Sequence, residues 1–426
     1  MKPQLFKNKC NKKTPLLMSP FGFALAACGG GETDLPGIGG SPSGAFVQQR
    51  LSVADISDYF SLLNLHPADF DQDGDTDFIV SHGSFPPGEQ ESYAAFALIN
   101  HDGVLQRQDI DGSPPLMTHA REGAFADFNN DGILDFILVG HGWDTAPFPG
   151  EPNALFYGSR EGFVDMSSLL PADSDFTHSV AVGDLNNDNF ADIYVGNTYG
   201  ENRIDPYLLI NQAGAGFVKV GLNEQDFGLF SKKYLSAEII DIDDDGTVDL
   251  IVGGQGGNNL IYQYDVLNEE MILAQILPEG HFGTDGHTVD LKAGDLNNDG
   301  LLDLVMLSTA DYSGLDLQIL IQTDDGTFED QTDQALPTFD RSQDWTPFIA
   351  LADVDQDGDL DILLSQTSER GPNAYLNNDG VFVESNADHK LEGFRNFYNV
   401  GLDQNTGDLF AANVAGGILT VEQIIL

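Results

Sequence analysis

Six nearly identical nine-residue segments, each beginning and ending with aspartate, recur along this 426-residue chain. They start at residues 69, 127, 184, 241, 295 and 353, so successive starts lie 54 to 58 residues apart. The first segment reads Asp-Phe-Asp-Gln-Asp-Gly-Asp-Thr-Asp, and the fifth reads Asp-Leu-Asn-Asn-Asp-Gly-Leu-Leu-Asp. Nearly equal spacing of this kind indicates one supersecondary unit that is used repeatedly along the chain.

The pattern of oxygen-bearing side chains in these segments predicts a calcium loop. Calcium takes six to eight oxygen ligands, and side chains at positions 1, 3, 5 and 9 can converge on one ion, with the position 7 carbonyl added. Position 6 must turn into a left-handed conformation, which suits the glycine of five copies and Asn189 of the third. Without an ion, two carboxylates about 5 Å apart repel each other by about 3 kcal/mol. The predicted metal-binding positions are Asp69, Asp71, Asp73, Asp75, Asp77, Asp127, Asn129, Asp131, Ile133, Asp135, Asp184, Asn186, Asp188, Phe190, Asp192, Asp241, Asp243, Asp245, Thr247, Asp249, Asp295, Asn297, Asp299, Leu301, Asp303, Asp353, Asp355, Asp357, Asp359 and Asp361.

Two alternatives to a calcium loop could explain one copy of the acidic segment, but they explain six copies poorly. Asp-Gly pairs mark ordinary turns, but six copies in register favour a common ligand. An EF-hand requires glutamate at position 12 and a flanking helix, whereas position 12 is occupied by Val80, Leu138, Val195, Val252, Met306 and Leu364. We therefore expect about six bound Ca²⁺ ions with a structural role, whose stabilising effects add.

Each segment is followed at once by a short apolar run, such as Phe136-Ile-Leu-Val or Leu250-Ile-Val. These runs lack polar alternation, which predicts strands buried on both faces. A second strand precedes each loop, and a hairpin with a glycine and phenylalanine tag follows it, as in residues 154–164. Four strands in about 57 residues are typical of a propeller blade. No stretch shows a helical period.

A seventh, incomplete copy lies at residues 400–410, and a last strand follows at residues 417–426. The strand that this copy lacks is found at the other end of the chain, where Ser43-Gly-Ala-Phe-Val47 resembles the hairpin tag. We therefore predict an all-β fold: a seven-bladed β-propeller with calcium loops in six blades. In this fold, residues 44–53 pair with the C-terminal strand and close the ring.

The loops and hairpin tags resemble FG-GAP/VCBS repeats, which also form the propeller of integrin α chains. The resemblance covers residues 44–426 and implies that each loop joins the two inner strands of a blade, at the rim opposite the usual ligand face. The sequence departs from the family pattern at Asn189 and in the incomplete seventh copy. Metal binding by that last copy is therefore in doubt.

The first residues predict an export signal rather than part of the fold. Five lysines precede a short apolar stretch that ends in Leu25-Ala-Ala-Cys28, a pattern similar to a bacterial lipoprotein signal peptide. We expect residues 1–27 to be removed, Cys28 to carry the lipid, and residues 28–43 to form a flexible tether. The glycine after the cysteine favours the outer membrane. A plain secretory signal with a coincidental cysteine is the alternative.

Charge excludes one class of partner. The chain has 68 acidic and 18 basic residues, and removing residues 1–27 would take its net charge from −50 to −55. Six Ca²⁺ ions would offset only part of this charge. The remainder repels nucleic acid, so we expect no nucleic-acid partner.

A ligand-binding surface is expected at the rim opposite the calcium loops, where histidine, aromatic and basic residues gather. The candidate residues are His119, Arg121, His141, His178, His287, Trp345 and Tyr398. We expect a non-catalytic lipoprotein that binds a glycan or a protein at the cell surface. The alternative is a polysaccharide lyase or glycoside hydrolase on the same scaffold, with histidine or tyrosine as base and Arg121 near a uronate. A third possibility is a structural partner within an envelope complex.

Overall fold

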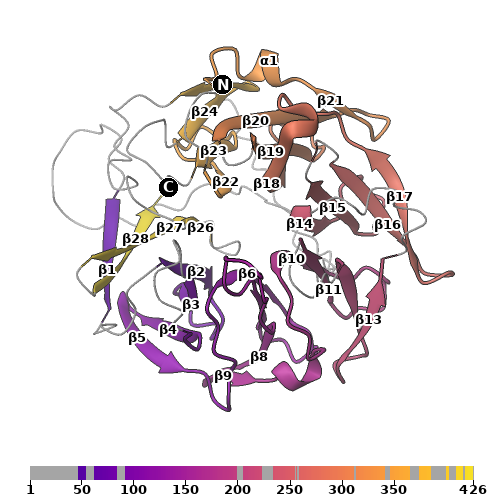
Figure 1. Ribbon diagram of the computed structural model, residues 1–426. Coiled ribbons are helices and arrows are strands. Elements are labelled where there is room, and N and C mark those ends of the chain that lie inside the picture. Colours follow the sequence, from indigo (N-terminus) through magenta and orange to yellow (C-terminus); the bar gives the residue numbers. More distant parts are fainter. Residues whose placement is uncertain are drawn as a thin grey trace, which may run out of the picture. The chain divides into compact units, whose positions relative to one another are not determined.

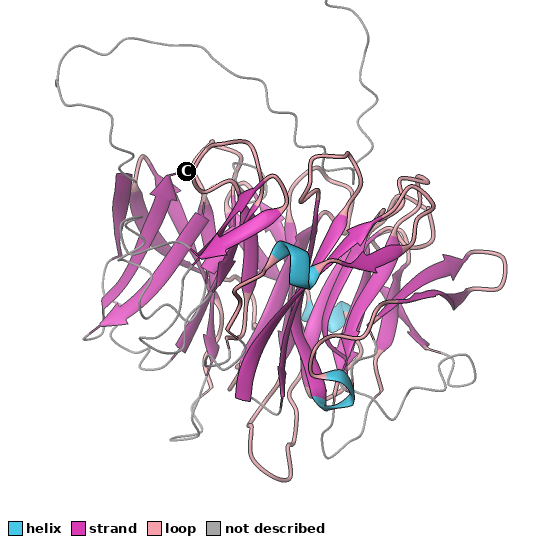
Figure 2. Ribbon diagram, turned by 90° about the horizontal axis from the view of Figure 1, so that it is seen from above, coloured by secondary structure: helices cyan, strands magenta, loops and turns pink. Residues whose placement is uncertain are grey.

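The computed structural model describes residues 47–53, 62–83, 92–198, 205–222, 234–254, 256, 259–310, 313–340, 346–364, 374–384, 400–402, 409–415 and 418–425. The chain divides into two units, residues 1–39 and 40–426, and every described residue lies in the second. The described residues form 28 strands and three short helical turns: η1 (Ser167–Leu169), η2 (Gly283–Asp285) and α1 (Thr332–Ala335) (Figure 2). The sequence showed no helical period, and the helices among the described residues are single turns of three or four residues. Among the described residues, none of the helices has the length and apolar character needed to span a membrane.

Five antiparallel sheets of four strands follow one another along the chain, and each keeps its strands in sequence order (Figure 1). The first consists of β6 (Ala120–Ala126), β7 (Asp135–Gly140), β8 (Ala154–Ser159) and β9 (Gly162–Asp165). The next contains β10 (Thr177–Gly183), β11 (Asp192–Asn197), β12 (Tyr207–Asn211) and β13 (Phe217–Gly221). It is followed by β14 (Tyr234–Ile240), β15 (Asp249–Gly254), β16 (Leu260–Asp265) and β17 (Glu270–Ile276).

The last two of these five sheets have the same order. One consists of β18 (Gly286–Gly294), β19 (Asp303–Ala310), β20 (Ser313–Gln322) and β21 (Phe328–Asp330). The other consists of β22 (Ile349–Ala352), β23 (Asp361–Leu364), β24 (Ala374–Asn378) and β25 (Val381–Glu384). Antiparallel neighbours joined by short turns are what the hairpin tags predicted.

The remaining eight strands form one sheet that unites the two ends of the described chain. Its strands are β1 (Val47–Val53), β2 (Leu62–Ala68), β3 (Asp77–Gly83), β4 (Phe96–His101), β5 (Val104–Asp109), β26 (Val400–Leu402), β27 (Leu409–Ala415) and β28 (Ile418–Ile425). Their order is β2-β3-β4-β5-β1-β28-β27-β26. β1 pairs antiparallel with β28, with Val47 opposite Ile425, and parallel with β5. The predicted pairing of the N-terminal strand with the C-terminal strand is therefore confirmed.

The first strands of the five four-stranded sheets, together with β2 and β26 at the two edges of the eight-stranded sheet, contact one another in series. β2 contacts β6, β6 contacts β10, β10 contacts β14, β14 contacts β18, β18 contacts β22, β22 contacts β26, and β26 contacts β2. The series returns to its starting strand, and these first strands lie innermost in Figure 1. An acidic loop follows each of six inner strands, and it always begins at the C-terminal end of the strand. These strands are β2, β6, β10, β14, β18 and β22.

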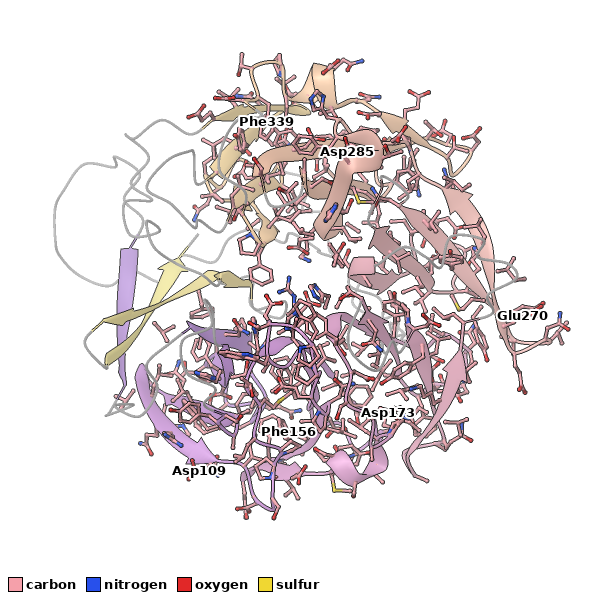
Figure 3. The ribbon with its side chains drawn as sticks, viewed as in Figure 1. Asp109, Phe156, Asp173, Glu270, Asp285 and Phe339 are labelled. Atoms are coloured by element: carbon pink, nitrogen blue, oxygen red, sulfur yellow. The ribbon has the colours of Figure 1, made fainter. Side chains whose placement is uncertain are left out.

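The second strand of each repeat is buried on both faces, as its apolar sequence predicted. Every residue of β3, β7, β11, β15 and β23 is buried, and only the last residue of β19 is partly exposed. The apolar cores lie between neighbouring sheets: Ile79 and Phe70 pack with Phe136 and Phe156 of the next sheet, and Phe156 is labelled in Figure 3. At the junction of the chain ends, Phe78 of β3 meets Phe410 of β27 edge to face, with ring centroids 4.9 Å apart.

Polar side chains join the inner strands in addition to the apolar cores. Glu122 of β6 accepts a hydrogen bond from the Val180 backbone N–H (3.0 Å), and Glu238 of β14 accepts one from Ala293 N–H (2.9 Å). Asp290 of β18 pairs with Lys292 (3.0 Å). Burial raises the pKa of Glu122 and of Glu238 to about 7, and the nearby Lys292 ammonium opposes this rise. Through these hydrogen bonds, Glu122 and Glu238 connect the inner strands of neighbouring sheets.

We predict that Phe410→Ala lowers the free energy of unfolding by about 3–5 kcal/mol, because it leaves a cavity against Phe78 where the two chain ends pack. Urea unfolding followed by circular dichroism measures this change. Val164→Ala is the control, since Val164 is 41% exposed, and it should change stability by less than about 0.5 kcal/mol. An equal effect of both changes would contradict a packing role for Phe410.

Candidate functional site

Each acidic loop joins the first and second strands of a repeat, and the ninth loop position is also the first residue of the second strand. These residues are Asp77, Asp135, Asp192, Asp249, Asp303 and Asp361. All six are at most 1% exposed, whereas positions 3 to 5 of the loops are mostly at the surface. Each loop therefore has one buried carboxylate at its base and several accessible ones above it.

Two positions of every loop adopt the left-handed conformation. At position 6 the φ angle is 99° for Gly74 and 69° for Asn189, so the predicted substitution of asparagine for glycine is confirmed. Position 4 was not predicted, yet it is left-handed in all six loops. Its residues are Gln72, Asn130, Asn187, Asp244, Asn298 and Gln356, with φ between 56° and 63°. Asparagine or aspartate, which tolerate this conformation well, occupy four of these six positions and are the sequence signal that marks it.

Within a loop, backbone N–H groups hold the side-chain oxygens in place. In the second loop Asp131 N–H donates to Asp127 Oδ1 (3.1 Å) and Asn129 Oδ1 (2.9 Å), and Gly132 N–H donates to Asp127 Oδ2 (2.8 Å). Ile133 N–H donates to Asp131 Oδ1 (2.9 Å). The same four bonds recur in the third and fifth loops. The carboxylate and amide oxygens of positions 1, 3 and 5 are thus held by the backbone of the loop itself.

The buried ninth residue connects the loop to the rest of the sheet. Asp361 accepts hydrogen bonds from Val354 N–H (2.7 Å) at Oδ2 and from Asn377 N–H (2.7 Å) on the third strand at Oδ1. Burial raises the pKa of Asp135 to about 7 and of Asp361 to about 6, and neighbouring loop carboxylates add to the rise. A cation beside these groups would offset the cost of keeping them ionised.

In three loops, the carboxylate oxygens of three aspartates lie within 4.8 Å of one another, close enough to share one cation. These sets are Asp69, Asp71 and Asp77; Asp241, Asp243 and Asp249; and Asp353, Asp355 and Asp357. Beside the first loop, Nδ1 of His101 at the end of β4 lies 3.2 Å from Asp73 Oδ2, and this hydrogen bond raises the pKa of His101. Hard carboxylate oxygens in these numbers suit Ca²⁺.

Successive loops are joined through the side chains of position 4. Gln72 of the first loop donates to the Gly132 carbonyl of the second (2.8 Å), and Asn130 of the second donates to the Asn189 carbonyl of the third (2.8 Å). Asn298 of the fifth loop donates to Asp359 Oδ1 of the sixth (2.6 Å). These bonds join neighbouring loops directly, and whether the effects of the loops add stays a prediction.

Buried amides of the third strands strengthen the same connections. Asn211 donates to the Phe128 carbonyl of the preceding loop (2.9 Å), Gln322 to that of Ile242 (2.8 Å) and Asn377 to that of Leu296 (2.7 Å). Two of these amides belong to the hairpin tags. Their role between repeats could not be deduced from one repeat alone.

At the other end of the inner strands, four histidines come together from three sheets. His82 lies in β3, His119 precedes β6, His141 follows β7 and His178 lies in β10. The ring of His141 is 4.8 Å from that of His119 and 4.6 Å from that of His178, measured between centroids. Of the predicted ligand-face residues, the structure thus groups His119, His141 and His178. His287 lies apart in β18, while Trp345, Tyr398 and the lipidation residue Cys28 lie outside the described residues.

Two of the three buried histidines of this group, His141 and His178, share one hydrogen bond. His141 Nδ1 lies 3.1 Å from the Gly142 carbonyl, which can only accept, so the proton of His141 is on Nδ1. Its Nε2 is then the acceptor for His178 Nε2, which lies 3.0 Å away. Burial lowers the pKa of His141 well below the ordinary value, and it lowers that of His119 to about 3. The imidazoles of His119 and His141 are therefore neutral at pH 7.

We predict that His119→Gln reduces the acid sensitivity of the fold. The folded-state pKa of His119 lies below its unfolded value of about 6.5, so its stabilising effect is complete above that pH and is lost as the pH falls. Between about pH 7.5 and about pH 5.0 the variant should lose about 2 kcal/mol less stability than the unmodified protein.

Chemical unfolding at both pH values in constant calcium measures this difference. His281→Gln, a change at an exposed histidine, is the control and should leave the acid sensitivity unchanged. Equal loss in His119→Gln and in the unmodified protein would contradict the prediction.

The loops and the strands that follow them coincide with a known repeat. The family model described as "FG-GAP-like repeat" matches residues 69–138, 127–195, 241–306 and 295–364, and that described as "FG-GAP repeat" matches residues 176–220. No curated protein matches the whole sequence significantly.

The chain is similar to several solved structures at low sequence identity, and one of them, with a TM-score above 0.5, supports a shared fold. BBS1N in complex with ARL6DN is 11% identical, with 88% of this chain and 97% of that chain covered and a TM-score of 0.51. The Dos1 propeller is 11% identical, with 88% and 94% covered and a TM-score of 0.49. The exotype rhamnogalacturonan lyase YesX is 11% identical, with 87% and 72% covered and a TM-score of 0.41. From its repeated acidic loops and the strands they join, the chain belongs to the FG-GAP-like repeat family.

Proposed function

We propose that this protein is a calcium-stabilised, non-catalytic binding protein of the bacterial cell surface, anchored by a lipid on Cys28 and recognising a glycan or a protein. The main support for the proposal is that the two ends of the inner strands carry different kinds of side chain. One end has carboxylates suited to a structural ion, and the other has a cluster of histidine side chains.

Calcium in the six loops is supported by their oxygen chemistry. Positions 1, 3 and 5 present carboxylate or amide oxygens already held by backbone N–H groups, so an ion would bind without reordering the loop. The ion would neutralise carboxylates that otherwise repel one another. Each site would stabilise the fold by about 1.4 kcal/mol for every tenfold excess of calcium over its dissociation constant.

A seven-bladed propeller accounts best for the strand contacts. The eight-stranded sheet consists of two four-strand units, β2 to β5 and β26 to β28 with β1, that meet through the β1–β5 pairing. Counting these units with the five separate sheets gives seven blades. The closed series of contacts between first strands is consistent with this count.

A lyase remains the second candidate because the structure brings His119 close to Arg121, the pairing that uronate chemistry requires. The Arg121 charge adds to burial in lowering the pKa of His119 to about 3. A general base works best when its pKa is near the operating pH. His119 is therefore poorly suited to abstract a proton at pH 7, and we favour binding over catalysis.

We predict that a glycan-array screen of residues 44–426 gives binding in calcium and loses it after chelation. Absorbance from a uronate double bond, measured on the same polysaccharides, should stay constant. Rising absorbance that His119→Ala abolishes would replace this proposal with the lyase. No binding to any glycan or envelope protein would contradict a recognition role.

We further predict that calcium binds cooperatively and that Asn130→Gly weakens the cooperativity. The change removes the bond from the second loop to the third, while glycine keeps the left-handed backbone of that position. Isothermal calorimetry should give a Hill coefficient above one for the unmodified protein and a lower one for the variant. In both proteins, the melting temperature should fall on chelation.

Gln356→Gly is the matched control, because Gln356 has the same loop position and a φ of 61°. Within the described residues its side chain forms no bond to another loop. Its Hill coefficient should equal that of the unmodified protein. Independent sites in all three proteins would exclude coupling through position 4, and absence of calcium binding would exclude calcium itself.

A further inference from the structure

The first acidic loop differs from its counterparts in having a histidine beside it. In five repeats, one backbone N–H of the third strand donates to the buried aspartate at loop position 9. The residues that directly follow these donors are His101, Ser159, Gln212, Thr323 and Asn378. Among these five positions, the first alone offers an imidazole nitrogen to its loop.

The backbone on both sides of His101 is bonded to the first loop. Asn100 N–H donates to Asp77 Oδ1 at loop position 9 (2.8 Å), and Asp102 N–H donates to Asp75 Oδ2 at position 7 (2.6 Å). The backbone of His101 is therefore positioned by bonds that do not involve its imidazole. A side chain placed in this way loses less freedom when it binds a ligand.

Three possible ligand atoms converge where His101 faces the loop. Nδ1 of His101 and carboxylate oxygens of Asp71 and Asp73 all lie within 4.8 Å of one another. The shortest of these separations that is recorded joins Nδ1 to Asp73 Oδ2 and measures 3.2 Å. Zinc holds nitrogen and oxygen ligands at about 2.0–2.2 Å. Ligand atoms this close can therefore reach one ion after small adjustments of their side chains.

These three groups are accessible from solvent, unlike the buried aspartate at the base of the loop. The side chains of His101 and Asp73 are 53% and 35% exposed, and Asp71 is partly exposed. An ion pair between His101 and Asp73 accounts for one of the contacts, but it leaves the Asp71 carboxylate unused. A cation would use all three groups and would also reduce the repulsion between the two carboxylates.

The nitrogen ligand favours a different ion from that expected in loops that offer oxygen alone. Calcium is a hard cation that proteins bind through oxygen atoms. Imidazole suits zinc and the other later dications of the first transition row. Zinc sites with three protein ligands commonly combine histidine with carboxylate. The set of His101, Asp71 and Asp73 is of this mixed kind.

We propose that the first loop binds a zinc ion through Asp71, Asp73 and His101, in place of the calcium proposed for the other five loops. This inference rests on the proposed function in one respect, because it takes the acidic loops as cation sites and specifies the ion of one of them. The ion would join the β4–β5 hairpin to the loop between β2 and β3. Both belong to the sheet that unites the two ends of the described chain.

The test is a calorimetric titration of the full chain with zinc chloride in the presence of calcium. His101→Asn is the variant, because the chain itself carries Asn378 at the equivalent turn position of the sixth repeat. We expect this change to weaken zinc binding at least tenfold, since loss of a group that merely supports a metal ligand typically costs about 10–100-fold. His281→Asn, at an exposed histidine outside the acidic loops, is the control and should match the unmodified protein.

Asn378→His is the converse test, because it places a histidine beside the sixth loop. The N–H of the next residue, Asp379, donates to Asp359 Oδ2 (3.2 Å), as the corresponding residue does in the first repeat. Carboxylate oxygens of Asp355 and Asp357 are also close enough together to share an ion. We expect this variant to bind one zinc ion more than the unmodified protein.

Two results would overturn the proposal. Equal zinc binding by His101→Asn and the unmodified protein would show adventitious binding to surface carboxylates only. An unchanged number of zinc ions in Asn378→His would show that a histidine at this position does not create a site.

A calcium titration without zinc separates this inference from the proposed function. If calcium binds while zinc binding is independent of His101, the calcium loops survive and this inference fails. If zinc binds as expected while calcium does not bind at all, the zinc site survives and the proposed role of calcium fails.

Discussion

The buried aspartate at the base of each acidic loop is the contact on which the rest of the fold depends. It is the first residue of the fully buried second strand, it closes its own loop, and in most repeats it receives a backbone N–H from the third strand. One carboxylate thus fixes three elements at once. Because it is removed from water, it is also the group for which a neighbouring cation matters most.

Polar contacts between repeats divide into two systems. Near the loops, amides of position 4 and of the third strands connect one repeat to the next. At the centre, Glu122 and Glu238 reach the inner strand of a neighbouring sheet. Apolar cores lie between the sheets, so each interface combines non-directional burial with a few bonds that fix its register.

Much of this architecture follows from the sequence, because the loops and buried strands are local patterns repeated at a fixed interval. The order of strands, the left-handed Asn189 and the pairing of the N-terminal strand with the last strand were all predictable. The bonds of Gln72 and Asn130 were not, since they join residues about 60 positions apart. Likewise, the separate histidine positions suggested a surface, but only the folded chain brings His141 within hydrogen-bond distance of His178.

The pairing of β1 with β28 has a consequence for how the molecule is made. Val47 lies 378 positions before its partner Ile425 in the sequence. Every other sheet can form from a continuous stretch of fewer than 60 residues, so it can assemble while synthesis continues. β1 can pair only after β28 has been synthesised, so closure joins the segments of highest sequence separation among the described sheets, and contacts of this kind form slowly.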